Sequence, residues 1–467
     1  MRDLLVLVLV TLVFGVPAEG HAQRVQSVPK NRAGAMSGAP DSLTVGSVVD
    51  QVLKTYPSIR ASRREVDAAT ARVGQARSRY WPRVSAVGTY RRQDPVPEIT
   101  VPGTPSSPGG GRTVGIQPNN LYDGHLQLRQ TLYDFGKTDA RIDQAKAAQR
   151  TAQRRVEVER VELAFQAVKA FYTTLLADAR LEVQRDQIDQ LKRTLAVVRR
   201  QKEAGTATEY EVKSTRARLS AARSQLAQFR SQRQRQEAEL QRLLGSAPGT
   251  SVVPRGTINP SLTPADSGRI EPDTLVDHAL LRHPSVTAAK AQVRAARRKV
   301  SVADESDSPT LSLDARGGVK NGYPGELNEP RLNESIGISL NVPLFEGFAT
   351  RRRVEEAQAQ VQAAEARLMD VRRQVSTRVE QAASDLRALL NRLASTRLRV
   401  EQARAAARLA RTRYEAGTIT NLELLEAETA LRQARLERTE VQFQVVLGRY
   451  ALQRAAGILL PLKASLL

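Results

Sequence analysis

The chain has 467 residues, and its 71 Lys and Arg against 49 Asp and Glu give a formal net charge of +22. Aromatic residues make up only 4% of the sequence and there is no cysteine. The lack of Cys excludes disulfides, thiolate catalysis and Cys-ligated metal sites, and so few aromatics argue against an ordinary compact core. The large positive charge first indicates a polyanionic partner, either nucleic acid or an anionic membrane surface.

The first residues are typical of a secretory signal peptide. An apolar run over 4–16 is followed by the small-x-small triplet Gly20-His21-Ala22. The run is too short to span a bilayer as a helix, so we expect cleavage after Ala22, with an uncleaved anchor as the alternative. Residues 23–42 are expected to be flexible. An exported chain of this kind is a poor candidate for a gene regulator.

The rest of the chain is two copies of one unit. Short sequence landmarks of the first copy recur in the second copy, first at one constant distance along the sequence and then at a second, shorter distance. The matching pairs are Val49-Asp50 with Val276-Asp277, Pro57-Ser58 with Pro284-Ser285, Leu132-Tyr133-Asp134 with Leu344-Phe345-Glu346, and Glu203-Ala204-Gly205-Thr206 with Glu415-Ala416-Gly417-Thr418. The offset changes only across a Gly/Pro-rich loop over 93–120, which an exposed connection tolerates. We therefore predict repeats at 43–245 and 273–457, a linker at 246–272 and a tail at 458–467.

Each repeat contains one very long helix, at 137–203 and at 349–415, because neither span holds Gly or Pro. At 1.5 Å per residue such a helix is a rod of about 100 Å. In the second copy, apolar residues step by threes and fours along a coiled-coil seam with one stutter; they are Val354, Ala357, Val361, Ala364, Leu368, Val371 and Val375, then Val379, Ala382, Leu386, Leu389 and Leu393.

The rods are predicted to fold back as helical hairpins over 137–244 and 349–456. Gly205 and Gly417 stand where a helix end needs a left-handed residue. Three residues later, each returning helix begins with a capping box, formed by Thr208 with Glu211 and by Thr420 with Glu423. Each hairpin thus has a tight tip.

Alternating apolar and polar residues predict β-hairpins at about 82–133 and 309–345. Strands of about ten residues with one apolar face fit a membrane barrel, and a soluble hairpin packed on helices is the alternative. Four strands per chain cannot close a barrel, because membrane barrels start at about eight strands. Several chains must then contribute. The predicted fold is mostly α with a membrane β-barrel contribution.

In this order and spacing, the sequence resembles the TolC-type outer-membrane efflux proteins. The resemblance covers about residues 43–457 and rests on the duplication, the strand-to-helix junctions Leu132-Tyr133-Asp134 and Pro343-Leu344-Phe345-Glu346-Gly347, and the tips Glu203-Ala204-Gly205-Thr206 and Tyr414-Glu415-Ala416-Gly417-Thr418. It implies a homotrimer with a 12-stranded barrel in outer-membrane lipid and a periplasmic helical tunnel closed at its tips. The chain would be the passive exit duct of a tripartite efflux or type I secretion system, working with a periplasmic adaptor and an inner-membrane pump or ABC transporter.

The resemblance also assigns site residues at the tips. The acidic positions that would ring the periplasmic entrance are Glu423 and Glu426, the aromatic latch position is Tyr414, and Glu211 is the acidic partner in the first copy. Capping is an equal alternative for Glu423. The latch Arg of the family is Ile419 here, which puts an Arg–carboxylate latch at that position in doubt. The turns expected to receive the adaptor, for which simple turn chemistry is the alternative, are Gly205-Thr206-Ala207 and Gly417-Thr418-Ile419.

Enzyme chemistry has little support in the sequence. The three histidines after the signal peptide lack metal-ligand spacing, and there is no phosphate-binding Gly loop or nucleophile elbow. We predict no enzyme activity, cofactor, metal site or nucleic-acid partner. The rival class is an exported coiled-coil scaffold that binds lipopolysaccharide or nucleic acid. Arginines along the rods predict a duct that is more electropositive inside than at its tip, and the cargo stays open between drug, metal and protein.

Overall fold

The computed structural model describes residues 43–101, 112–247, 252–258, 260–323 and 325–460. The signal peptide, the flexible segment up to residue 42 and most of the predicted C-terminal tail lie outside this description. The two longest elements are α4 (Lys137–Glu203) and α8 (Ala349–Glu415), each of 67 residues. Both predicted rods are therefore confirmed, with the expected ends.

The two halves repeat the same order of elements. The first half contains α2 (Val45–Thr55), α3 (Pro57–Arg77), the 3₁₀ turn η1 (Ser78–Tyr80), a strand pair, α4 and α5 (Glu209–Leu244). The second contains α6 (Pro272–Arg282), α7 (Pro284–Asp304), the turn η3 (Glu305–Asp307), a strand pair, α8 and α9 (Asn421–Ala455). The linker adds a turn, η2 (Pro264–Arg269).

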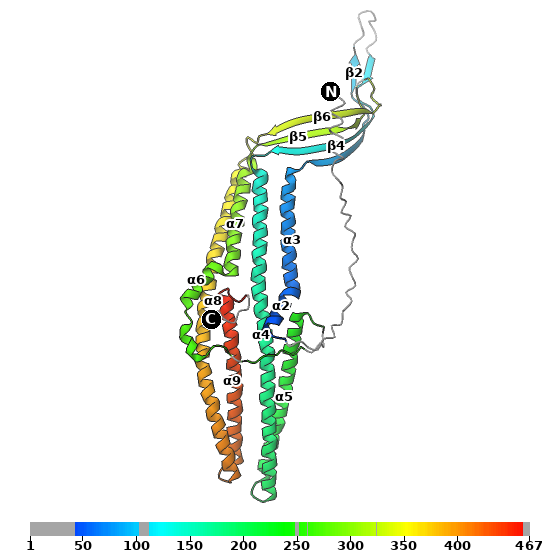
Figure 1. The fold of residues 1–467 in the computed structure, drawn as a ribbon. Coiled ribbons are helices and arrows are strands. Elements are labelled where there is room, and N and C mark those ends of the chain that lie inside the picture. Colours follow the sequence, from blue (N-terminus) through cyan, green and yellow to red (C-terminus); the bar gives the residue numbers. More distant parts are fainter. Residues whose placement is uncertain (1–42, 102–111, 248–251, 259, 324, 461–467) are drawn as a thin grey trace, which may run out of the picture. The chain divides into compact units, whose positions relative to one another are not determined.

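The helices lie in a single layer. On the side of the strands, the order of packed neighbours is α3, α4, α7 and α8, and towards the hairpin tips it is α5, α4, α9 and α8 (Figure 1). The long helices α4 and α8 run through both parts of the layer, while the shorter helices fill the space beside them. Each row is therefore four helices wide.

The strands form one antiparallel sheet in the order β1, β4, β5, β6. Their bounds are β1 Arg83–Arg92, β4 Asn120–Tyr133, β5 Thr310–Lys320 and β6 Arg331–Asn341. Pairing of β4 with β5 joins the hairpins of the two halves, and β1 and β6 form the two open edges. The loop expected over 93–120 also holds a short hairpin, β2 (Glu98–Val101) with β3 (Arg112–Gly115), that alternation over so few residues did not reveal.

The sheet has one apolar face and one polar face. Across its strands, Val84 pairs with Leu128, Leu128 with Ala315, and Ala315 with Ile336. Paired residues share a face, so this row is apolar from edge to edge. Ile336 and Ile338 are about 70% exposed, so no part of the described chain covers that face at β6. The neighbouring row, on the other face, is polar on three strands, with Arg83, Arg129 and Asp314 in register, and ends at Gly337 on β6.

Three apolar clusters hold the helices together. The first, around Phe171, joins α2, α4 and α5 to α9, and it includes Val252 from the predicted linker. The second lies between α8, α9, α6 and α7, and the third lies near the hairpin tips. The seam of α8 differs from its prediction. Among the predicted seam residues up to 371, only Ala357 is buried. After the stutter, Ala383 and Leu390 are fully buried in place of the predicted Ala382 and Leu389. This change follows because the extra residue of the stutter rotates the seam toward α9.

Candidate functional site

The hairpin tips have the same backbone construction in both halves. Gly205 and Gly417 adopt left-handed conformations with φ of 77° and 71°. After each glycine the next amide returns to the preceding helix: Thr206 N donates to the Gln201 carbonyl at 2.8 Å and Thr418 N to the Arg413 carbonyl at 2.9 Å. These bonds satisfy carbonyls that would otherwise be left over at the helix end.

The threonines that follow cap the returning helices. Thr208 N donates to the Glu211 carboxylate at 2.7 Å, and Glu211 N donates to Thr208 Oγ1 at 3.3 Å. Thr420 and Glu423 make the matching pair at 2.8 and 3.3 Å. Both capping boxes thus form as their spacing predicts. Glu211 and Glu423 therefore have a structural duty whatever else they do at the tip.

Tyr414 is buried at the tip, with 5% of its surface exposed, within the third apolar cluster. Burial, followed by the nearby charge of Glu211, raises the pKa of Tyr414 to about 12. Its hydroxyl has no hydrogen-bond partner among the described residues. Within the chain, Tyr414 acts through packing next to Glu211. Ile419, at the position of the family's Arg, packs on the same cluster with Ala207.

Glu423 and Glu426 are exposed on the first turns of α9. Glu426 makes no ion pair or hydrogen bond within the described part of the chain, whereas Glu423 is engaged in its capping box. The structure does not bring the predicted residues Tyr414, Glu423 and Glu426 into mutual contact, since Tyr414 is buried and both carboxylates face outward.

A line of polar contacts that the sequence reasoning missed joins the hairpins of the two halves. Asn421, Glu428 and Arg435 recur every seventh residue on α9 and face the first hairpin. Asn421 Nδ2 donates to Thr215 Oγ1 on α5 at 3.0 Å, and Arg435 lies 3.6 Å from Asp186 on α4. We call Asn421, Glu428, Arg435 and their partners the inter-hairpin seam. Heptad spacing of three polar residues within an apolar stripe is the signal that could have revealed it.

Glu428 is the most connected member of the inter-hairpin seam. Its Oε1 accepts hydrogen bonds from Gln190 Nε2 at 2.6 Å and Thr194 Oγ1 at 3.4 Å on α4, and from Arg411 Nη2 at 3.2 Å on α8. Its Oε2 is buried without a partner in the described chain. Burial raises the pKa of Glu428, and the charge of Arg411 and the bonds from Gln190 and Thr194 oppose that shift only in part. This carboxylate therefore links three helices from both halves.

The turn residues assigned to docking differ in exposure. Gly205, Thr206, Gly417 and Thr418 are exposed, whereas Ala207 and Ile419 are partly buried. Two large apolar side chains at equivalent positions of the halves extend the exposed tips. They are Tyr210, 77% exposed, and Leu422, 55% exposed.

The opposite end of the long helices carries exposed aromatic side chains. At each strand-to-helix junction two aromatic rings meet edge to face, Tyr133 with Phe135 at 4.6 Å and Phe345 with Phe348 at 5.4 Å between centroids. The two residues before each long helix, Phe135-Gly136 and Gly347-Phe348, all adopt positive φ, so the same bent junction recurs in both halves. Trp81, which precedes β1, is 73% exposed. Aromatic residues at the ends of an apolar band are typical of membrane interfaces.

Within the described ranges no helix is both long enough and apolar enough to cross a bilayer. Nor do the described residues contain a group of three or more His, Asp or Glu able to hold a metal ion.

This fold and these tips define a class of outer-membrane export channels, and comparison with known proteins identifies that class. The family model for outer membrane efflux proteins matches residues 48–246 and 275–458, one segment in each half. The chain belongs to this TolC-type family.

Individual proteins that resemble this chain support the same family assignment. Protein CyaE of Bordetella pertussis is 31% identical over 430 residues, which cover 89% of this chain and 84% of the relative. Alkaline protease secretion protein AprF of Pseudomonas aeruginosa is 26% identical over 343 residues, covering 72% and 70%. The crystal structure of outer membrane protein VceC from Vibrio cholerae matches in fold with a TM-score of 0.70 at 21% identity, covering 88% of this chain and 96% of that one.

The chain is therefore an outer-membrane efflux channel that reaches into the periplasm, and it is not an enzyme. Membership implies a trimeric channel that works with efflux or secretion partners. This assignment replaces the rival expectation of an exported scaffold that binds an anionic polymer.

Proposed function

We propose that three copies of the chain form a passive exit duct whose barrel has twelve strands and whose periplasmic entrance is closed at the hairpin tips. The supporting observation is the sheet, which has four strands, two open edges and an apolar face left bare. Open strand edges are not tolerated in lipid because their backbone groups lack partners. Pairing of β6 with β1 of the next copy satisfies both edges, and the apolar face then meets lipid.

The repeat structure supports the same ring at the level of the helices. Each chain supplies a layer four helices wide, with α3 and α5 at one edge and α8 at the other. Three such layers side by side continue the barrel as a tunnel into the periplasm. The tunnel supplies no energy of its own, so an inner-membrane pump or ABC transporter must drive transport.

The inter-hairpin seam and Tyr414 are proposed to hold the entrance closed. Glu428 ties α9 to α4, Asn421 ties it to α5, and Tyr414 fills the space next to Glu211. Opening the entrance requires the second hairpin to move away from the first, which breaks these contacts together. In this proposal Glu426 and Glu423, which are exposed on the first turns of α9, ring the entrance with negative charge that attracts cations.

A periplasmic adaptor is proposed to dock on the exposed tip residues. Gly205, Thr206, Gly417 and Thr418 offer backbone and hydroxyl groups, while Tyr210 and Leu422 offer apolar area at matching positions. Large exposed apolar side chains on a monomer often mark contact surfaces. Tyr210→Ser with Leu422→Ser should weaken adaptor crosslinking at the tips and leave the trimer intact.

Protein export is the cargo class that we favour. The name of the relative AprF states that it serves the secretion of an alkaline protease, and this relation supports a type I secretion system over a drug or metal efflux system.

The experiment that tests the duct is fractionation followed by electrophoresis with and without heating. The full chain should be found in outer membranes, need detergent for extraction, and migrate as a trimer that heating dissociates. A protein released by salt or alkali as a soluble monomer would refute the proposal.

A further inference from the structure

A large groove is hollowed into one face of the helix layer next to the sheet. Its volume is about 1000 Å³ and its walls come from α3, α4, α7 and α8. Each helix contributes residues at i, i+3, i+4 and i+7, for example 65, 68, 69 and 72 on α3, which is one helix face. Because both edge helices line the same groove, the layer is concave on this side.

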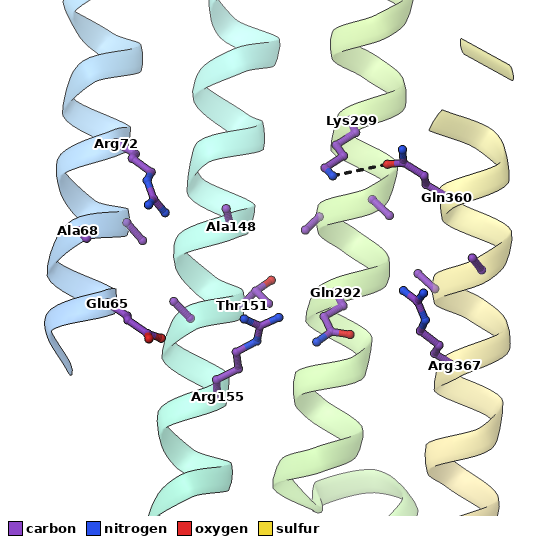
Figure 2. Close-up of a pocket in the computed structure, with 16 residues that line it drawn as sticks. Glu65, Ala68, Arg72, Ala148, Thr151, Arg155, Gln292, Lys299, Gln360 and Arg367 are labelled. Carbon is purple, nitrogen blue, oxygen red and sulfur yellow. Dashed lines mark hydrogen bonds between the residues drawn. The ribbon is translucent and has the colours of Figure 1, made fainter. Parts of the chain in front are cut away.

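The groove is lined by cations and small residues. Arg72 from α3 and Arg367 from α8 point inward from the edge helices, with Arg155 and Lys299 between them (Figure 2). The only carboxylate among its lining residues is Glu65. Lys299 donates to Gln360 Oε1 at 3.5 Å. None of the four cations makes an ion pair with a residue of the described chain, although such pairs are common elsewhere on these helices. The donors of Arg72, Arg155 and Arg367 are therefore free to bind a ligand, and Lys299 uses only one of its three donors on Gln360.

A second, smaller groove of about 160 Å³ shows which face of the sheet lies on the same side as the first groove. It lies at the junction of helices and sheet, where Lys137 and Arg141 of α4 meet Arg83 and Arg129. Arg141 precedes Arg155 by two heptads, so both grooves lie on one face of α4. Arg83 and Arg129 belong to the polar row of the sheet. The concave face of the helix layer and the polar face of the sheet therefore lie on the same side.

Cations also dominate this second groove. Arg129 is paired with Asp314 at 2.7 Å, whereas Arg83, Lys137 and Arg141 make no ion pair with described residues. If the apolar face of the sheet meets lipid, the polar face and both grooves line the lumen.

We infer that the two grooves form one cation-lined wall inside the part of the tunnel that adjoins the barrel, and that this wall binds carboxylate groups of an acidic polypeptide as it is exported. The inference rests on the proposed duct and adds the chemical class of its cargo. Arginine side chains bind carboxylates through paired N–H donors, and unpaired Arg in a concave site raises the local concentration of anions. Three copies would surround the cargo with the same groups.

The test measures binding of a glutamate decapeptide to the purified full-length trimer in detergent by isothermal titration calorimetry at low salt. Arg155→Gln with Arg367→Gln should lower the affinity by about tenfold or more, since hydrogen bonds between charged groups are strong. The matched control is Arg150→Gln with Arg154→Gln, which removes the same charge from exposed positions of α4 that do not line the groove. It should change the affinity less than about twofold.

The outcomes separate the inference from the proposed duct. No binding of the glutamate peptide, stronger binding of a lysine decapeptide, or equal losses in the groove and control variants would overturn the inference. In each of these cases the duct proposal stands if the proteins are heat-modifiable trimers that conduct ions in planar bilayers. Failure to form such trimers in the wild-type chain would overturn both.

Discussion

Glu428 on α9 accepts a hydrogen bond of 2.6 Å from Gln190 on α4, so a buried carboxylate in the second half of the chain is bound by an amide in the first. The same oxygen also receives Arg411 at 3.2 Å from the neighbouring α8. Any separation of the two hairpins must break the hydrogen bond between Gln190 and Glu428, whereas the contact between Arg411 and Glu428 lies within the second hairpin and is left intact. The closed arrangement of the tips therefore depends on Glu428 more than on any other side chain of the inter-hairpin seam.

Replacing Glu428 by Ala should favour the open entrance. The change leaves Gln190 and Arg411 without their acceptor, and because Arg411 is 45% exposed we expect a loss of only about 1–2 kcal/mol in the closed state. This corresponds to a rise of about tenfold in the open population. Single-channel recordings in planar bilayers should show more frequent openings. Unchanged opening of Glu428→Ala, with a normal trimer, would show that the seam does not hold the entrance.

The opening should depend on pH through Glu428. Burial raises its pKa above the ordinary value of 4.5 in the closed state, and exposure on opening should return it. A raised pKa stabilises the closed state at low pH, and this contribution is lost as the pH rises through the raised value. The charged groups facing Glu428 include Arg411 on α8 and Arg193 on α4.

We therefore expect the open probability to increase as the pH rises above 4.5 and through the raised pKa of Glu428. Glu428→Gln, which cannot ionise, should flatten this profile, so the difference between the two proteins isolates Glu428 from the exposed Glu423 and Glu426. A wild-type channel that opens more readily as the pH falls would contradict the sign.

Tyr414 should act through its ring and not through its hydroxyl. The buried hydroxyl has no partner in the described chain, so Tyr414→Phe should keep the entrance closed and leave stability unchanged or raise it by up to about 1 kcal/mol. Tyr414→Ala should cost about 3–5 kcal/mol, because it leaves a cavity in the tip cluster. Conductance and thermal melting of the two variants measure both effects. Strong opening by Tyr414→Phe would instead reveal a hydrogen bond to another subunit.

Glu426 offers a clean test of the acidic entrance. It is exposed and has no capping duty, so Glu426→Ala should weaken block of the channel by multivalent cations without loss of stability. Glu423→Ala should weaken block too, but also cost about 1 kcal/mol through loss of its capping box. Cation block that is equal in wild type and Glu426→Ala would remove Glu426 from the entrance.

Close contact between β4 and β5 should make Gly318 essential for assembly. A Cβ at Gly318 would overlap the Gly124 carbonyl and the backbone of His125, whereas a Cβ at the adjacent Gly317 meets no atom within 4 Å. Gly318→Ala should thus reduce the yield of heat-modifiable trimer in outer membranes, and Gly317→Ala should not. Equal yields would show that the β4–β5 pairing adapts to the added methyl group.

Local sequence signals predicted the long helices, the capping boxes and the two main β-hairpins because each depends on residues close in sequence. Gly205 and Gly417 require a left-handed turn wherever they stand at a helix end. The inter-hairpin seam depends on the pairing of the two halves instead, so Glu428 looked like one more charged residue on a helix. The basic grooves were missed for the same reason, since Arg72, Arg155 and Arg367 are far apart in the sequence and meet only when α3, α4, α7 and α8 form one layer.

The most direct measurement of the closed entrance uses a disulfide, because the chain has no natural cysteine to interfere. Asn421 and Thr215 are in side-chain contact across the two hairpins, with 3.0 Å between Nδ2 and Oγ1. Thr215→Cys with Asn421→Cys, added to Glu428→Ala, should return the raised open probability in single-channel recordings to the wild-type level when oxidised, and a reductant should raise it again. Openings that stay frequent while the disulfide is fully formed would contradict a duct closed by contact between its two hairpins.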